Sequence, residues 1–63
     1  MITSKSEALY HIHHTEQLYS WGEISKVALE EKLSYFLGVL CGYDYEEYDT
    51  QRKRVNRKYG FDL

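Results

Sequence analysis

One long apolar stretch, residues 23–41, constrains the fold of this chain more than any other feature. On a helix, which turns by about 100° per residue, its apolar and aromatic residues form two adjoining groups. The first group is Ile24, Ala28, Tyr35 and Val39, and the second is Leu29, Leu33, Phe36, Leu37 and Leu40. A helix that is apolar over more than half its circumference has neighbours on two sides. We therefore predict a central helix with two other helices packed against it.

Capping signals indicate where the helices begin and end. In a capping box, the side chain of a Ser or Asp just before the helix accepts a hydrogen bond from the backbone N–H three residues later. Such boxes begin at Ser4, Ser20 and Asp44. Gly42 and Gly60 suit the left-handed residue that follows many helices. These signals predict three helices, at about 5–18, 21–41 and 45–59. Short links between them make neighbouring helices roughly antiparallel.

The composition agrees with an all-α fold. The 63 residues include no proline and only four glycines, and 43% of them are hydrophobic. A chain of this size buries only about 60% of its unfolded surface, so its single core is marginal and oligomerisation is a common remedy. We predict one three-helix domain over residues 1–63 that associates into a dimer.

The setting that the sequence predicts is cytoplasmic. The single cysteine, Cys41, excludes an intramolecular disulfide and fits a reducing compartment. Residues 1–9 have no apolar core of the signal-peptide type, and no run approaches about 18 apolar residues. The net charge of −2 gives no general attraction to nucleic acid or to an anionic membrane. We expect no membrane association.

No group of side chains forms a convincing catalytic or metal site. On a helix, His11 and His14 share a face with Glu7, but His13 points elsewhere, and zinc needs three or four converging ligands. A solvated polar face explains these residues better. Cys41 is placed near a helix C-terminus, where the helix dipole disfavours a thiolate. We predict no enzymatic activity, no catalytic residues, no metal and no cofactor.

Tyrosine content is the main functional signal. Seven tyrosines are present, and tyrosine is enriched at protein interfaces because it offers a large contact area at little entropic cost. Tyrosines at the rim of a small core are the alternative explanation. On the predicted last helix one side, which we call the tyrosine seam, carries Tyr45, Tyr48, Arg52, Val55 and Tyr59. Arg52 can stack on one of these rings or pair with an acid. The interface residues that we predict are Tyr10, Trp21, Tyr35, Tyr45, Tyr48, Arg52 and Tyr59.

Ser34 and Gly38 belong to a row of small side chains that runs along the predicted central helix, beside its apolar faces. A glycine inside a helix costs about 1 kcal/mol relative to alanine. Gly38 is therefore expected where the first helix or another chain approaches closely. The alternative is a glycine tolerated near a helix end.

The basic run at residues 51–58 supports a rival function. Its candidate nucleic-acid contacts are Lys53, Arg54, Arg57 and Lys58, which would lie opposite the tyrosine seam and be exposed to phosphates. However, Asp44, Glu46, Glu47 and Asp49 occupy the first turns of the same helix. Acidic residues first and basic residues last is the order that the helix dipole favours, and Asp49 and Lys53 form a supporting pair. This explanation needs no ligand, so nucleic acid is not the partner that we expect.

Together these features predict a non-catalytic protein–protein interaction module. Small acidic, tyrosine-rich helical proteins of phages and mobile elements often inhibit larger proteins or act as adaptors for them, which is an association and not a mechanism. The alternative is a small nucleic-acid-binding protein that uses its basic C-terminal helix. The sequence does not identify the partner.

Overall fold

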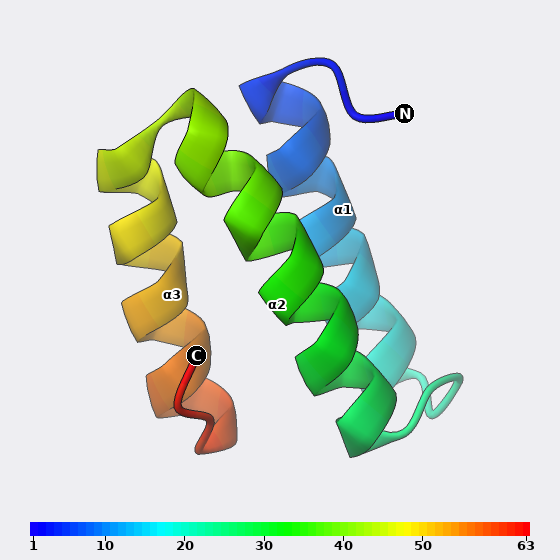
Figure 1. Ribbon diagram of the computed structural model, residues 1–63. Coiled ribbons are helices and arrows are strands. Elements are labelled where there is room, and N and C mark those ends of the chain that lie inside the picture. The colour runs from blue at the N-terminus through cyan, green and yellow to red at the C-terminus, as the bar shows by residue number, and fades with distance from the viewer.

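Three helices and no strands make up the structure, a computed structural model that describes all 63 residues. The helices are α1 (Lys5–Ser20), α2 (Lys26–Tyr43) and α3 (Tyr45–Tyr59), and α2 lies between the other two (Figure 1). This confirms the all-helical, three-helix class and the central position of the second helix. None of the helices has the length and apolarity needed to cross a membrane.

The core is built mainly from one face of α2. The fully buried apolar side chains of the core are Ala8, Ile12, Leu29, Leu33, Leu37, Leu40 and Val55. Four of them belong to the leucine-rich group predicted for the central helix, while Phe36 of that group is only half-buried. The other predicted face is partly covered: Ile24, Ala28 and Val39 are half-buried, whereas Tyr35 is 66% exposed. The two helices that pack on α2 therefore cover only part of its apolar circumference.

Two of the three predicted helix starts are confirmed. The Ser4 hydroxyl accepts from the backbone N–H of Glu7 at 3.2 Å, and the Asp44 carboxylate accepts from that of Glu47 at 3.1 Å. The first box is only half formed, because the Glu7 carboxylate accepts from the hydroxyl of Thr3 instead of reaching back to Ser4.

The predicted start of the second helix is wrong. The first helix continues to Ser20, and Ser25 is the residue that caps α2, accepting from Ala28 N–H at 3.2 Å. Gly22 adopts a positive φ of 77°, which glycine tolerates without a steric penalty. Its N–H and that of Glu23 donate to two carbonyls in the last turn of α1, those of Tyr19 and Leu18. This is the Schellman ending of a helix, so Gly22 is a stop signal for α1 and not part of the next helix.

The predicted stop at Gly42 is also wrong, whereas the one at Gly60 is confirmed. Gly42 lies within α2, which runs on to Tyr43, and only Gly22 and Gly60 have positive φ. Asp44 is extended and makes the whole turn by itself: its N–H donates to Leu40 and its carboxylate caps α3. A left-handed residue is unnecessary where one extended residue links the two helices.

Gly38 does not mark a close contact with the first helix. A Cβ added there would meet no atom within 4 Å, so the expected approach of α1 is wrong, and contact with another chain stays a prediction.

Candidate protein-binding surface

A buried carboxylate, Glu16, joins α1 to α3. Its side chain is 8% exposed, and both of its oxygens accept from the Arg54 guanidinium, at 2.8 and 2.6 Å. The Tyr59 hydroxyl also donates to it, at 2.8 Å. In the sequence Glu16 only interrupts an apolar stripe. An acidic residue within an apolar stripe, together with an arginine in a later helix, was the sequence signal that could have indicated the ion pair of Glu16 and Arg54.

Burial and hydrogen bonds shift the pKa values of both Glu16 and Tyr59 away from neutral pH. Burial raises the pKa of the Glu16 carboxyl, but the hydrogen bonds from Arg54 and Tyr59 outweigh burial, so its pKa lies below the ordinary value. Burial and the hydrogen bond to Glu16 together raise the pKa of Tyr59 to about 12. At neutral pH both groups therefore keep one protonation state, and neither is suited to transfer a proton.

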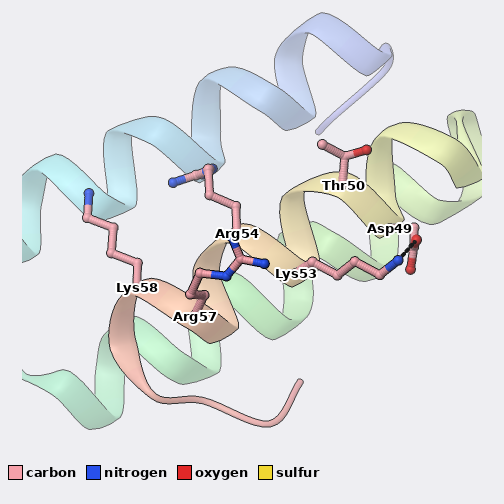
Figure 2. A pocket seen from close by; sticks show the side chains of 6 residues that line it. All are labelled: Asp49, Thr50, Lys53, Arg54, Arg57 and Lys58. Carbon is pink, nitrogen blue, oxygen red and sulfur yellow. Dashed lines mark ion pairs between the residues drawn. The ribbon is translucent and has the colours of Figure 1, made fainter.

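The Glu16 cluster, which consists of Glu16, Arg54 and Tyr59, changes the interpretation of the basic run. Arg54, predicted to be exposed, points toward α1 (Figure 2). Its guanidinium is bound to Glu16. Lys53 pairs with Asp49 at 2.9 Å, confirming that predicted pair. The basic side chains line an open hollow of about 470 Å³ on α3. Among its four cations, Arg57 is the one without an ion pair, while the Lys58 ammonium lies 3.8 Å from Glu16. The hollow is therefore less positive than its sequence indicates.

The structure distributes the predicted interface residues over several places. Tyr45, Tyr48 and Arg52 lie together along the first half of α3, where the Arg52 guanidinium is 5.9 Å from the Tyr48 ring centroid. Arg52 also pairs with Asp49, at 2.8 Å. Trp21 is 61% exposed in the link between α1 and α2. By contrast, the hydroxyl of Tyr59 is engaged within the chain by Glu16.

The largest continuous aromatic group, which we call the aromatic surface, crosses from α1 to α2. It consists of Tyr10, His11, His14, Tyr35 and Phe36. Tyr10 stacks on His14 with ring centroids 5.6 Å apart, and His11 stacks on Phe36 at 5.1 Å. Edge contacts from Tyr10 to His11 and from Tyr35 to Phe36 complete the group. Because a helix turns by about 100° per residue, Tyr10 and His14 lie roughly 120° and 160° around α1 from Glu16. The aromatic surface and the Glu16 cluster therefore lie on different sides of α1.

Sequence reasoning found the two tyrosines of this surface but not their partners. His11 and His14, considered above as metal ligands, are aromatic neighbours of Tyr10 and Phe36. No three His, Cys, Asp or Glu side chains lie close enough together to hold a metal ion. Cys41 is half-buried on α2. The spacing of Tyr10, His11 and His14 was a usable signal, because residues three or four apart meet on a helix.

The fold and this surface define a class of protein: a small three-helix domain with an exposed cluster of aromatic side chains. No family model matches the chain, and comparisons with curated proteins and with solved structures give no significant match.

Proposed function

We propose that this chain, with its neighbouring helices roughly antiparallel, is a non-catalytic module that binds a protein partner through the aromatic surface. The observation that carries the proposal is a chain of five rings, each in contact with at least one other, in which Tyr10 and Tyr35 are 61% and 66% exposed. Their hydroxyls make no hydrogen bond within the chain, unlike those of Tyr43 and Tyr59. An exposed aromatic cluster with free polar tips is typical of binding hot spots.

Ring contacts within the surface favour binding because they order the side chains beforehand. Immobilising a free side chain on association costs about 0.5–1.5 kcal/mol. His14 holds Tyr10, and Phe36 holds both His11 and Tyr35. Part of that entropic cost is therefore met during folding.

Surface area indicates what kind of partner to expect. The chain exposes 4171 Å², close to the roughly 4,300 Å² typical of a monomer of its 7.6 kDa mass. The chain is therefore as compact as an ordinary monomer of its mass, and we expect a partner to bind an already folded domain. A standard interface buries about 800 Å² per partner, so the aromatic surface would be its centre and the surrounding polar side chains its rim.

Two partners fit this proposal, in the cytoplasmic setting that the sequence favours. One is a second copy, giving the predicted homodimer by the commonest oligomer symmetry. The other is a larger protein that the chain inhibits or for which it acts as an adaptor. Light scattering up to high micromolar concentration distinguishes them, because a dimer doubles the 7.6 kDa mass. A strictly monomeric mass would exclude the second copy.

The decisive experiment compares equally exposed tyrosines inside and outside the surface. Tyr35→Ser should abolish self-association, or retention of a host protein in affinity isolation. Tyr45→Ser is the matched control, since Tyr45 is 65% exposed and its recorded ring contact is with Tyr48 on α3. Loss of binding in both variants, or in neither, would contradict the proposal.

Nucleic-acid binding remains the alternative, supported by the basic hollow on α3. Changing Arg57 and Lys58 to glutamine should then weaken binding and flatten its salt dependence by about one unit of slope for each lost phosphate contact. Two of the four cations already have close carboxylate partners. We therefore expect no retention of DNA or RNA at physiological salt. Micromolar binding there would favour this alternative function.

A further inference from the structure

Half of the chain's eight lysine and arginine residues line the hollow on α3, although the chain as a whole has a net charge of −2. We call this site the basic hollow, and its lining residues are Asp49, Thr50, Lys53, Arg54, Arg57 and Lys58. Its volume of about 470 Å³ is in the range of small-ligand pockets. No hydrophobic side chain lines it. A ligand that fits the basic hollow is therefore polar and anionic.

Two of the four cations are held by ion pairs within the chain. Lys53 pairs with Asp49 at 2.9 Å, and the Arg54 guanidinium donates to Glu16 at 2.8 and 2.6 Å. Lys53 accordingly extends toward Asp49, whereas Arg54 extends toward α1 (Figure 2). Arg54 is not free to turn into the hollow, because that would leave the buried Glu16 without its partner. The hollow is therefore already open before a ligand arrives, which lowers the cost of binding.

The other two cations keep their hydrogen-bond donors free. Arg57 is exposed and takes part in none of the chain's ion pairs. The Lys58 ammonium lies 3.8 Å from Glu16, which is too long for a hydrogen bond. These two side chains are adjacent in the sequence and line the same hollow. An arginine fork and a lysine ammonium are thus available to one anion.

The charge left in the hollow indicates which anion fits. Asp49 and Glu16 compensate two of the four cations, so two positive charges remain. A phosphate monoester carries a charge of about −1.5 to −2 at pH 7 and three acceptor oxygens, and it matches the two remaining charges. A single carboxylate would leave one cation uncompensated. The charge balance therefore favours a phosphate monoester.

Nucleic acid fits the same hollow less well. A strand brings a series of phosphates, and its binding depends on a protein that neutralises several of them. Only two cations of the basic hollow remain uncompensated. Nucleobases stack on aromatic rings, and no aromatic side chain lines the hollow. These features favour a single phosphate group on a small polar carrier.

We propose that the basic hollow binds one phosphate monoester group. The Arg57 guanidinium binds two of its oxygens in the bidentate manner typical of arginine, and Lys58 adds a point charge. Thr50 lies about 10 Å before Arg57 along α3, so its exposed hydroxyl is placed for the carrier rather than the phosphate. A phosphorylated serine of a protein and a sugar phosphate share this chemistry. The inference goes beyond the proposed function, because the basic hollow shares no residue with the aromatic surface.

NMR titration of the full-length protein at physiological salt tests the site with two probes. One is a capped glycine–phosphoserine–glycine peptide, and the other is glucose 6-phosphate. Millimolar concentrations of at least one should shift the Arg57 side-chain signal and the Lys58 amide signal, and the probe that binds more tightly identifies the source. Arg57→Gln should weaken binding by about tenfold or more, because a pair of charge-assisted hydrogen bonds is lost.

Two further variants separate a local site from general charge attraction. Lys32→Gln causes the same change in net charge as Arg57→Gln, and Lys32 is exposed and has no ion pair. It should leave the affinity unchanged. Asp49→Asn removes an acid from the hollow and should tighten binding by about threefold or more. Equal weakening by Arg57→Gln and Lys32→Gln would overturn the inference.

Other outcomes would also overturn the assignment. One is the absence of shifts at Arg57 and Lys58 with both probes; another is equal binding of the peptide without its phosphate. DNA or RNA that binds more tightly than both probes at physiological salt would replace the monoester by the alternative function. If Arg57→Gln did not fold by circular dichroism, Lys58→Gln would take its place. Tyr35→Ser should not change phosphate binding, so this test and that of the proposed function fail independently.

Discussion

At the scale of single residues, Glu16 decides how α3 is attached to α1. The backbones of these two helices do not pack closely, and their connection is made by side chains. The carboxylate has lost most of its water, so it depends on Arg54 and Tyr59 for compensation. Arg54 keeps 35% exposure, so it retains some solvation, and the pair is less sensitive to disruption than a fully buried one.

Glu16→Gln should lower the free energy of unfolding by about 1.5–3 kcal/mol at pH 7, the range for hydrogen bonds to charged groups. The folded-state pKa of Glu16 is lowered, so its contribution is complete above the unfolded pKa of about 4.3. It is lost as pH falls through the folded pKa. Urea unfolding should therefore show the difference between variant and unaltered protein shrinking below about pH 4.

Glu31→Gln is the matched control, because Glu31 is exposed and takes part in none of the chain's ion pairs. Its effect should stay within about 0.5 kcal/mol at every pH. A Glu16→Gln difference that is the same at pH 7 and at pH 3 would show that the carboxylate charge is not what stabilises the cluster.

At the scale of elements, the link between α1 and α2 shows two capping signals in competition. Ser20 and Ser25 are both serines preceding a possible helix, and only Ser25 acts as a cap. Gly22 decides between them, because its left-handed conformation ends α1 after the position where the second helix was expected to begin.

Ser25→Ala should cost about 1 kcal/mol, the usual loss for an N-cap serine. Ser20→Ala should cost nothing measurable, since Ser20 is an exposed last residue of α1 and alanine is the better helix former. Urea unfolding of the two variants at one pH makes the comparison. A larger loss for Ser20→Ala than for Ser25→Ala would restore the helix start predicted from the sequence.

At the scale of the whole molecule, stability rests on a core of seven buried apolar side chains, four of them leucines of α2. Both neighbouring helices pack on α2, so loss of one leucine weakens the whole domain rather than one helix.

Leu37→Ala should cost about 2–5 kcal/mol through lost burial and the cavity left behind. A chain of this size has roughly 3–5 kcal/mol of stability, so the variant should be largely unfolded at 37 °C. Val27→Ala is the control, since Val27 is 66% exposed on the same helix. A circular dichroism melt of Leu37→Ala close to that of the unaltered protein would show that α2 is not the centre of the fold.

What the sequence by itself determined about this protein is its local organisation. The helical class, the caps at Ser4 and Asp44, the stop at Gly60 and the core leucines of α2 all follow from residues a few positions apart. Capping bonds and helical periodicity act over three or four residues, so the necessary information is contiguous.

Only the tertiary structure decided which side chains from different helices meet. Glu16 and Arg54 are 38 residues apart, and their pairing depends on the rotation and register of α1 and α3 about α2. The same rotation left Tyr35 exposed, brought His11 onto Phe36 and kept the space at Gly38 open. Local propensities do not specify that rotation, because it is set by how the side chains of all three helices pack into one core.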